Sequence, residues 1–415
     1  MKIAYLAPEI PALSATFVYK EILKLKDFGT EVIPFSVHYP SSVANEAGLN
    51  ELKKQVVHLY EQSKLSVLFA HIYLLLSHPL RYLTSLRLLI SDMLTIGFCS
   101  RNAFGLVFRF FYAGSLAKEL IQTKCQHIHV HFAHVPTDIA MYAASLSNIE
   151  FSVTAHANDL FERGWLLKQK VERSAFFATI SEFNKRYLAD IGISTENIRI
   201  VRCGVDDEQF EPRRNFISGS KIKVGVVGRL VEKKGIDTLI NAVSKLKNQG
   251  QLIELSIAGS GPLENELMEQ VKECNLTADD VIFLGAIPNS DVSDFITSLD
   301  VFVLPCKMDK SGDMDGIPVV LMEAMLSGVP VISTKLSGLP ELVIDKHTGL
   351  MVAPNNDADL ANAILDMIND SNQRNMMILN AVDKVKKEFS LRGNTERLND
   401  MFRNVVVNKF GSKED

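Results

Sequence analysis

The chain lacks the features of several common protein classes. Its five cysteines are odd in number and scattered, with no Cys-x-x-Cys pair, so we interpret them as core or spectator thiols of a reducing compartment. A net charge of -5 argues against a nucleic-acid partner. The first apolar run ends too soon, at Pro8 and Glu9, to be a secretory signal. We therefore expect the protein to stay in the cytoplasm.

Two further patterns are missing. The longest uncharged run, Ser66 to Leu80, is shorter than the roughly 20 residues of a membrane-spanning helix and contains two histidines and a proline. Neither Gly225-Val-Val-Gly228 nor Gly259-Ser-Gly261-Pro262 completes a Gly-x-Gly-x-x-Gly element with an acid about 20 residues later. This disfavours a transmembrane protein and a dinucleotide dehydrogenase.

What the chain does contain is an alternation of apolar strands and amphipathic helices. At 415 residues and 47% hydrophobic, it exceeds the comfortable size of one core, so we expect two domains of about 200 residues each. The pattern predicts two doubly wound α/β domains, with a linker at 206–220. The expected strands are 2–7, 31–37, 127–133, 151–155, 175–180, 198–203, 223–228, 255–258, 281–284, 301–304 and 329–333, with a first helix at 16–28.

The stretch from Asp315 to Pro330 brackets a short helix with two acids. Pro318 suits the first helical position, and the backbone N–H groups after it lack intrahelical partners, so the helix start can bind phosphate. Asp315 precedes the helix and Glu323 lies about one and a half turns inside it. The two acids could hold the sugar and the ribose of one nucleotide sugar. Alternatively, Asp315 caps the helix and Glu323 is a solvated helix residue.

A second basic element lies upstream. The segment Lys221 to Arg229 reads as a buried strand ending at Gly228, so Arg229 and Lys234 would follow its carboxyl end. Ligands bind at this end of the strands in open α/β sheets, and both cations can neutralise a diphosphate. The alternative is a solvated basic loop. Gly261, in a later tight turn, serves either close approach to the nucleotide or helix packing.

Together these elements resemble the glycosyltransferase family 4 pattern, and Asp315-Gly-Ile-Pro-Val-Val-Leu-Met-Glu323 is similar to its colanic acid and exopolysaccharide branch. The chain departs from the family in having Asp315 where Glu is usual, and Pro11 to Phe17 where many members have a Gly-Gly loop. The further matching elements are Thr154-Ala-His-Ala-Asn-Asp159, Cys203-Gly-Val-Asp206, Val227-Gly-Arg-Leu230 with Lys234-Gly235, Ala258-Gly-Ser-Gly-Pro262, Ser337-Gly-Leu-Pro-Glu341 and Thr348-Gly-Leu350.

The resemblance implies the GT-B fold, two Rossmann-like domains facing each other across a cleft. Residues 1–205 would form the acceptor domain, completed by a carboxyl-terminal helix within 391–415, and residues 206–390 the donor-binding domain. It also implies a retaining hexosyltransferase that uses a nucleoside diphosphate sugar and a saccharide or polyprenyl-linked acceptor, in cell-surface polysaccharide biosynthesis. Because no Asp-x-Asp metal motif appears where a metal-dependent transferase would need one, we expect no cofactor and no obligatory metal ion.

The resemblance carries site roles onto particular residues. The catalytic candidates are His156, Arg229, Lys234 and Asp315. The donor-binding candidates are Gly228, Gly261, Ile317, Pro318, Val319 and Glu323. The candidates for the cleft and the acceptor are Ser14, Thr16, His131 and Asp159.

Histidines alternate at positions 127, 129 and 131, so in a strand all three share one face. A metal could be held there, but no carboxylate pattern supports one, and satisfied strand histidines are the alternative. His156 follows an apolar strand and, by the resemblance, contacts the donor sugar. Asp159 would orient that loop by holding His156 in one tautomer, or else caps the next helix.

An apolar insertion at about 64–118 carries several arginines and a single acid, Asp92. Such helices suit the interface of an anionic membrane, and a lipid-linked acceptor would favour that peripheral location at the inner face. Ordinary core-facing helices are the alternative.

Two other functions fit parts of this pattern. A nucleotide-sugar epimerase of the same fold would share the donor site and need no acceptor. A non-catalytic, two-lobed sugar-binding protein would ordinarily carry an export signal and would not need the phosphate-site residues.

Overall fold

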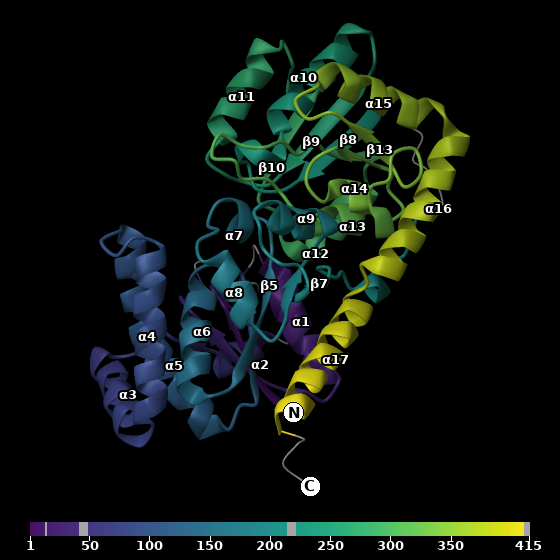
Figure 1. Cartoon of the computed structure of the whole chain (residues 1–415). Helices are drawn as coiled ribbons and strands as arrows, with labels where there is room; N and C mark the ends of the chain where they lie inside the picture. Colours follow the sequence, from purple (N-terminus) through teal and green to yellow (C-terminus); the bar gives the residue numbers. More distant parts are fainter. Residues whose placement is uncertain (13–14, 41–48, 214–220, 411–415) are drawn as a thin grey trace. The chain divides into compact units, whose positions relative to one another are not determined.

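The computed structural model describes residues 1–12, 15–40, 49–213 and 221–410. The chain forms two compact units, coloured along the sequence in Figure 1. Unit 1 comprises Met1–Ile180, Asn184–Arg202 and Leu391–Asp415, and unit 2 comprises Ser181–Phe183 and Cys203–Ser390.

Unit 1 contains a parallel sheet of seven strands in the order β3-β2-β1-β4-β5-β6-β7. Its strands are β1 (Lys2–Ala7), β2 (Glu31–Ser36), β3 (Val57–His58), β4 (His127–His131), β5 (Glu150–Ala155), β6 (Phe177–Thr179) and β7 (Ile198–Ile200). The helices along this part of the chain are α1 (Thr16–Asp27), α2 (Leu49–Gln55), α3 (Lys64–Ser77), α4 (Pro79–Thr95), α5 (Arg101–Thr123), α6 (Val135–Ser147), α7 (Asn158–Phe161), α8 (Leu167–Arg173), α9 (Glu182–Asp190) and α17 (Leu391–Phe410).

Apolar residues cover both faces of this sheet. On β4, Ile128 and Val130 point into one buried cluster with α5 and α6, while the histidines point to the other face. That face packs against α1 and α17, with Phe402 against the rings of His127 and His129. Both faces of the sheet are therefore closed to solvent, so any polar side chain on β4 is buried.

Unit 2 contains a parallel sheet of six strands in the order β10-β9-β8-β11-β12-β13. Its strands are β8 (Ile222–Val227), β9 (Ile253–Ala258), β10 (Val281–Gly285), β11 (Val301–Leu304), β12 (Val331–Thr334) and β13 (Leu350–Val352). Its helices are α10 (Ile236–Asn248), α11 (Glu264–Glu273), α12 (Asn289–Thr297), α13 (Val319–Leu326), α14 (Leu339–Leu342), α15 (Asp357–Asn369) and α16 (Ser371–Glu388), with short 3-10 turns η2 (Asp207–Gln209) and η3 (Glu232–Lys234).

In each sheet the strand order reverses once. The chain of unit 1 builds outward from β1 through β2 to β3 and then resumes on the other side with β4, so the reversal lies between β1 and β4. In unit 2 it lies between β8 and β11. The loops that follow these strands diverge there, and this is the usual place for a ligand in an open α/β sheet.

The predicted strands are found, with small differences at their ends. Strand β4 ends at His131 rather than 133, because Phe132 adopts a left-handed backbone with φ of 74°. The sequence pattern missed β3 and β13, which have two and three residues and are too short for periodicity to reveal. In the predicted linker, only the turn η2 is regular among the described residues, and 214–220 lie outside them.

The apolar insertion consists of α3, α4 and most of α5. These helices pack on one another, and α4 and α5 pack on α6. The one acid of the insertion, Asp92, is fully buried and receives two hydrogen bonds from Arg173 and one from Tyr142. Within the described residues, no helix has both the length and the apolar character needed to cross a bilayer.

Candidate active site

The reversal point of unit 2 gathers four charged residues. Lys233 and Lys234 lie in the turn η3 after β8, and Asp313 and Asp315 lie in the loop between β11 and α13. The Nζ atom of Lys234 is 2.6 Å from Asp315 Oδ2, and that of Lys233 is 2.7 Å from Asp313 Oδ2 and 3.5 Å from Asp315 Oδ1. We call these four residues the lysine–aspartate cluster.

The ion pairs of this cluster are only slightly exposed. The side chains of Lys234 and Asp315 are 15% and 13% exposed. Burial by itself raises the pKa of Asp315, but the charges of Lys234 and Lys233 outweigh it, so this pKa lies below its usual range. Burial lowers the pKa of Lys234, but Asp315 outweighs it and the pKa is raised. Both side chains are therefore charged at neutral pH.

Cys306 lies beside this cluster and is a core thiol, one of the two roles predicted for the cysteines. It follows β11, is fully buried, and its Sγ donates a hydrogen bond to Asp315 Oδ2 at 3.4 Å. Burial raises the pKa of this thiol well above its usual range, and the charge of Asp315 adds to the effect. The thiol therefore stays protonated and serves as a weak donor to the carboxylate.

Arg229 differs from the two lysines because its side chain is exposed. Gly228 immediately precedes it at the end of β8, and a Cβ at Gly228 would lie 3.5 Å from the Cε of Lys234. The structure thus places Arg229 at the carboxyl end of β8, as predicted, with its guanidinium facing solvent and Lys234 packed behind the glycine.

Gly261 serves close packing within the protein. A Cβ on Gly261 would lie 2.5 to 2.8 Å from backbone atoms of Leu230, and Leu230 N donates to Ser260 O at 3.0 Å. Gly259 is more constrained still. Its φ is 145°, and a Cβ at this position would lie only 1.9 Å from Gly228 O. Of the two explanations left open by the sequence, the structure supplies the packing one, and contact between Gly261 and a donor stays a prediction.

Helix α13 begins one residue later than expected. Pro318 is its N-cap, with extended backbone (φ -66°, ψ 129°), and not its first helical residue. Ile317 is buried, and Pro318, Val319 and Glu323 are half-buried. The first N–H groups of α13 still lack partners one turn earlier, so the phosphate-binding argument holds with the helix start moved to Val319.

In unit 1, His156 and Asp159 follow β5. The carboxylate of Asp159 accepts hydrogen bonds from the backbone N of His156, at 2.9 and 3.1 Å, and from Ala133 N at 2.6 Å. Burial raises the pKa of Asp159 to about 6, against these bonds. Asp159 therefore ties the loops after β4 and β5 together, but it does not contact the imidazole. The expectation that it sets the tautomer of His156 is wrong.

The ring of His156 contacts another histidine instead. Its Nε2 is 3.0 Å from Nδ1 of His131, and Nε2 of His131 is 2.7 Å from the hydroxyl of Tyr5 and 3.1 Å from Oε1 of Glu21. Tyr5 also donates to Glu21. We call Tyr5, Glu21, His131 and His156 the histidine network. It lies at the reversal point of unit 1, between β1 and β4.

A carboxylate therefore does lie beside the histidine strand, contrary to the sequence argument. Ligand atoms of Glu21, His129 and His131 lie within 4.8 Å of one another, a spacing that a metal ion could use. The protein already engages the nitrogens, however: His129 bonds to Ser152 at 2.8 Å and to Thr154 at 3.1 Å. The hydrogen bonds of His129 and His131 satisfy their buried ring nitrogens, so these nitrogens need no ion as a partner.

Two of the predicted site residues remain, Thr16 and Ser14. Thr16 is the first residue of α1 and is half-buried. Ser14 lies outside the described residues. Thus unit 1 brings together His131, His156 and Asp159, and unit 2 brings together Gly228, Lys234 and Asp315.

Sequence reasoning missed five residues of these two groups: Tyr5, Glu21, Lys233, Cys306 and Asp313. Tyr5 lies within a predicted strand and Glu21 within a predicted helix, where each reads as part of a periodic pattern. The available signal was their position on or after the strands that flank the reversal points.

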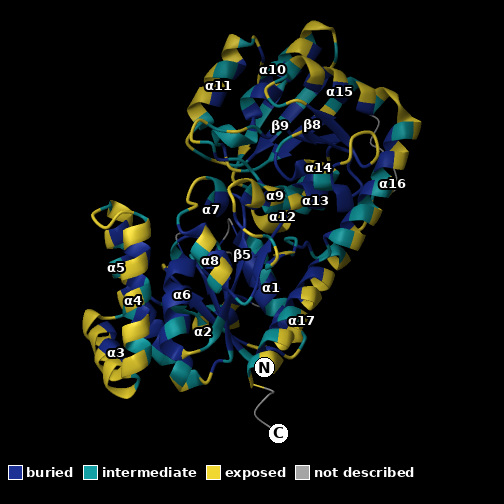
Figure 2. Ribbon diagram, in the orientation of Figure 1, coloured by how far each residue is buried: buried dark blue, intermediate teal, exposed yellow. Residues whose placement is uncertain are grey.

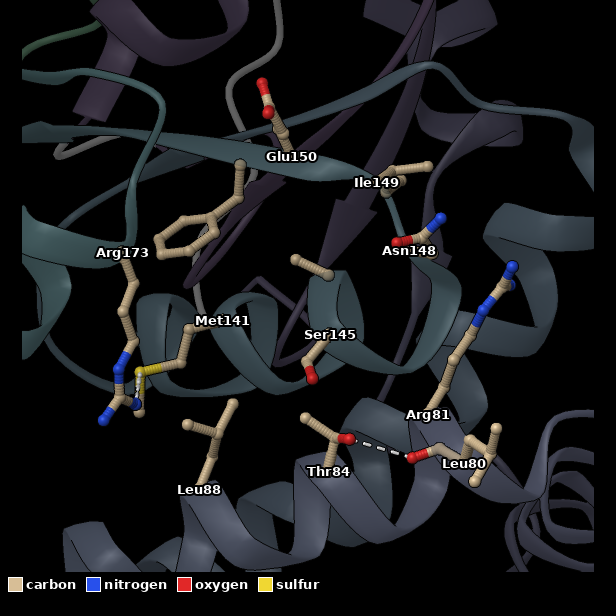
Figure 3. A pocket seen from close by; sticks show the side chains of 12 residues that line it. Leu80, Arg81, Thr84, Leu88, Met141, Ser145, Asn148, Ile149, Glu150 and Arg173 are labelled. Atoms are coloured by element: carbon tan, nitrogen blue, oxygen red, sulfur yellow. Dashed lines mark hydrogen bonds between the residues drawn. The ribbon is translucent and has the colours of Figure 1, made fainter. Parts of the chain in front are cut away.

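A separate pocket of about 480 Å³ opens at the amino end of β5, the opposite end from His156. It is lined from α4, α6 and the start of β5, and Figure 3 shows Arg81 and Arg173 on opposite sides of it. Arg173 is engaged by Asp92. The lining, taken from the described residues, includes none of the predicted site residues, so this pocket is not the candidate active site.

Comparison with known proteins agrees with the geometry. Residues 207–384 match the model of the glycosyl transferases group 1, and residues 96–209 match that of glycosyltransferase family 4. The chain is therefore similar to glycosyltransferase family 4 in its first half and to the glycosyl transferases group 1 in its second. The division between the two matches falls where unit 1 gives way to unit 2, so a family model matches part of each unit.

Two similar relatives are named for exopolysaccharide biosynthesis. The chain is 35% identical over 225 residues to the colanic acid biosynthesis glycosyltransferase WcaL of Escherichia coli, covering 54% of this chain and 55% of the relative. It is 34% identical over 242 residues to the amylovoran biosynthesis glycosyltransferase AmsK of Erwinia amylovora, covering 57% and 59%. The matches therefore span little more than half the length of these relatives.

Solved structures share the whole fold at low identity. Anabaena Alr3699/HepE in complex with UDP matches with a TM-score of 0.72 and 16% identity, over 97% of this chain and 100% of that one. The sucrose-phosphate synthase of Thermosynechococcus elongatus matches with a TM-score of 0.74 and 18% identity, over 98% and 100%. The fold is the GT-B fold with two Rossmann-like units, as predicted.

Proposed function

We propose that this chain transfers a sugar from a nucleoside diphosphate sugar to a hydroxyl of a saccharide or lipid-linked saccharide, with retention at the anomeric carbon, in exopolysaccharide biosynthesis. The observation that carries the proposal is the lysine–aspartate cluster at the reversal point of unit 2, next to the start of α13. The names of WcaL and AmsK, and the UDP and UDP-glucose complexes of the HepE protein, support the substrate class.

The cluster suits a diphosphate because its charges balance before the ligand arrives. Two lysines face two aspartates. Arg229, which is exposed after Gly228, and the N–H groups at the start of α13 add positive potential from outside the cluster. Lys234, held at 2.6 Å by Asp315, is already ordered when the donor binds, so no side-chain entropy is lost at that step.

The proposed chemistry centres on the leaving diphosphate. The bond between the anomeric carbon and the phosphate oxygen breaks, and its electron pair stays on the diphosphate. The acceptor oxygen bonds to the same face of that carbon, and its proton passes to an oxygen of the departing phosphate. Arg229, Lys234 and the N–H groups of α13 stabilise the growing negative charge. Asp315 aligns the sugar hydroxyls, and Glu323 holds the ribose.

The first test is a thermal-shift series with nucleoside diphosphates and their sugars. A ligand that binds only the folded state raises the melting temperature. We expect one donor series to stabilise the wild type and to lose its effect in Glu323→Ala. Lys245→Ala, an exposed surface change in the same unit, is the matched control and keeps the response. No response of the wild type to any nucleotide overturns the proposal.

Product analysis then separates this function from the two alternatives. With the stabilising donor, we expect nucleoside diphosphate release only when a hydroxyl acceptor is supplied. Conversion of the donor to another sugar nucleotide without acceptor would indicate an epimerase. Binding without turnover under any acceptor would indicate a sugar-binding protein.

We also propose that turnover needs no divalent ion, because the lysines and Arg229 supply the positive charge that a metal would otherwise provide. Activity is expected to persist after dialysis against excess chelator. Complete loss, restored by Mg²⁺ or Mn²⁺, contradicts this part of the proposal.

Finally, we propose a peripheral location on an anionic membrane, at its cytoplasmic face, through α3, α4 and α5. These helices bury one apolar face in unit 1 and expose another, which Figure 2 shows in yellow. Among residues 64–118 the exposed charges are Lys64, Arg87 and Arg101, all positive. The exposed large apolar side chains are Leu65, Leu68, Phe69, Ile72, Tyr73, Leu75, Leu76, Leu80, Leu83, Ile90, Leu94, Phe98, Phe104, Phe108 and Phe111.

Such an apolar, cationic surface fits the headgroup region of an anionic bilayer. Vesicle flotation tests this location. We expect the wild type to float with phosphatidylserine vesicles, less so at high salt, and the double variant Leu76→Gln, Leu80→Gln to float poorly. Leu379→Gln, at a residue 65% exposed on α16 of unit 2, is the control. A wild type that floats with neither neutral nor anionic vesicles contradicts the proposal.

A further inference from the structure

The pocket at the amino end of β5 has a polar end and an apolar end. Its volume is about 480 Å³, and it lies between α4, α6 and the start of β5, all within unit 1. Figure 3 shows Arg81 and Asn148 at one end, and Leu88 and Met141 at the other. The members of each pair are seven residues apart along α4 and along α6, so the two ends are about 10 Å apart. The pocket therefore suits a molecule with a polar group and an apolar chain.

Arg81 is a cation of this pocket that the protein does not neutralise. Its side chain is half-buried and, within the described part of the chain, its guanidinium makes neither an ion pair nor a hydrogen bond. Arg173 on the other side differs, because both of its terminal nitrogens hold Asp92, at 2.6 and 2.7 Å. A guanidinium carries five N–H donors, and a partly buried one usually has an anionic partner. Arg81 lacks the anion that Arg173 has.

The acids beside the pocket do not supply that anion. Asp92 is fully buried behind its ion pair. Glu150 lies at the start of β5, where side chains alternate between faces; Phe151 points into the cluster with α6, so the carboxylate of Glu150 points to the other face. Burial lowers the pKa of Lys409 on α17, and the charge of Glu150 opposes that shift, so Glu150 already has a cation nearby. An anion that binds Arg81 must come from outside the protein.

The rim of the pocket continues into the apolar surface of α3 and α4. Leu80 lines the pocket and is 81% exposed, and Leu76, four residues earlier, is 78% exposed. Thr84, one turn after Leu80 on α4, is exposed on the same rim. This is the surface proposed above to lie on an anionic membrane. A lipid of that membrane can therefore reach the pocket without leaving the interface.

We propose that this pocket binds one anionic phospholipid, with its phosphate on Arg81 and Asn148 and the start of one acyl chain along Leu88 and Met141. Arginine binds phosphate through parallel N–H donors, and the exposed amide of Asn148 adds another. A choline headgroup would bring a second cation beside Arg81, so phosphatidylglycerol should bind better than phosphatidylcholine. The inference rests on the proposed membrane location for the source of the lipid only.

The bound lipid is an anchor and not a substrate. The pocket lies at the amino end of β5, whereas His156 follows its carboxyl end. A strand of six residues separates the two by more than about 15 Å. A lipid held by α4 and α6 would thus fix the height and orientation of unit 1 on the bilayer.

The first test uses a soluble lipid, so that no membrane is needed. We expect dihexanoyl phosphatidylglycerol, below its critical micelle concentration, to shift the ¹³C-methyl signal of Met141 saturably, with the signal assigned from Met141→Leu. The methyl signal of Met322, buried in unit 2, is the internal reference and should not move. The absence of a shift at Met141 overturns the proposal. Equal affinity for dihexanoyl phosphatidylcholine, or for inorganic phosphate, overturns it as well, because headgroup charge or acyl chain would then add nothing.

Two arginine variants on α4 separate the pocket from general surface charge. Arg81→Gln removes the phosphate partner, so we expect about tenfold weaker binding of dihexanoyl phosphatidylglycerol. Arg87→Gln, at an exposed residue that is not among the described residues lining the pocket, should bind like the wild type. In flotation with phosphatidylcholine vesicles that contain phosphatidylglycerol, Arg81→Gln should lose more binding than Arg87→Gln. Equal losses would assign the effect to surface charge alone and overturn the proposal.

Thr84→Trp tests the space and not the charge. The Thr84 hydroxyl donates only to Leu80 O of its own helix, at 2.9 Å, so the substitution should leave the fold and the melting temperature intact. Because the indole fills the mouth of the pocket, we expect the shift of Met141 to disappear although Arg81 is present. A variant that binds the soluble lipid like the wild type overturns the proposal.

The two assays also separate this pocket from the proposed membrane location. If the soluble lipid binds as expected but the wild type floats with no vesicle, the membrane location fails and the pocket stands. If the wild type floats but no soluble lipid shifts Met141, the pocket fails and the membrane location stands.

Discussion

The two units place polar groups at equivalent points of similar sheets, but they use opposite chemistry there. At the reversal between β1 and β4, unit 1 has the histidine network, whose members are almost fully buried. At the reversal between β8 and β11, unit 2 has the lysine–aspartate cluster, whose side chains reach 9% to 23% exposure. In the first site burial keeps the ring of His156 neutral, and in the second Lys234 and Asp315 stay charged.

The difference follows from depth and from partners. His129 lies on β4 and His156 directly follows β5, and both are buried, so desolvation disfavours the charged form and lowers the pKa of both. Lys234 and Asp315 lie in loops beyond the strand ends, where each finds an opposite charge that outweighs its desolvation. A parallel sheet thus fixes where a site forms, and the depth and pairing of its residues decide which charges it can keep.

The largest effect should come from breaking the charged site. Lys234→Ala removes the cation that we propose next to the leaving diphosphate, and it leaves Asp315 with the more distant Lys233. We expect kcat to fall by roughly 10² to 10³-fold, the usual loss of one transition-state contact. Steady-state kinetics against Lys245→Ala, the exposed control on α10, measure it. A change below tenfold would mean that Lys234 does not face the reaction.

Acid should distinguish the two sites by stability. The neutral histidines of unit 1, including His127 and His134 with pKa values of about 3, hold folded-state pKa values below the unfolded value of about 6.5. The contribution of these neutral histidines to stability is complete above about pH 6.5 and is lost as the pH falls below about 6.5. At pH 5 His127 and His134 each withdraw about 2 kcal/mol from the stability of unit 1, and protonation of Asp159 returns only about 1 kcal/mol.

Unit 2 should not respond over the same range. The lowered pKa of Asp315 makes its contribution fall only below the unfolded pKa of about 3.9, and the raised pKa of Lys234 makes its contribution fall only above about 10.4. Hydrogen exchange at pH 7.5 and at pH 5, read separately on strands of each unit, checks this. Equal loss of protection in both units would contradict the assigned charge states.

A third experiment tests how much the charged site depends on close backbone packing. In Gly259→Ala, the new Cβ would fall 1.9 Å from Gly228 O, at a φ of 145°. We expect unit 2 to lose on the order of 3 kcal/mol in free energy of unfolding. Gly250→Ala also has positive φ but has no atom within 4 Å, so it should cost about 1 kcal/mol. Denaturant titration measures both, and equal losses would assign the whole effect to backbone strain.

The smallest effect should come from the neutral member of the charged site. Cys306→Ala removes a weak S–H donor 3.4 Å from Asp315 and leaves both lysines in place. We expect less than about a threefold change in kcat/KM for the donor. Cys125→Ala, a buried thiol in unit 1, controls for lost packing. A loss as large as that of Lys234→Ala would show that the thiol, and not charge alone, controls the carboxylate.

Much of the fold could be read from the sequence because parallel strands buried on both faces are nearly continuous apolar runs. Strand β11 was predicted to the residue, and β1 likewise. The short strands β3 and β13 escaped because two or three residues carry no period. The start of α13 was misplaced by one residue because Pro318 is accepted both before the helix and in its first turn.

The candidate site, like the fold, could be predicted from the sequence only in part. The sequence named Lys234 because it follows the end of a predicted strand, and Asp315 because it precedes the start of a predicted helix. It could not name Glu21 as the partner of His131, because the two are 110 residues apart and meet only when α1 packs on β4. It also assigned the tautomer of His156 to Asp159, its neighbour in sequence, whereas the ring faces His131.

The sequence by itself determined the two α/β units and the residue types at each strand end, since these depend on local periodicity and on spacing along the chain. Only the tertiary structure decided which of those residues share protons and charges. Pairing of β1 with β4, and of β8 with β11, brings together groups that are distant in sequence. Burial then fixes whether each group is neutral or charged, because desolvation depends on the surroundings that the whole fold provides.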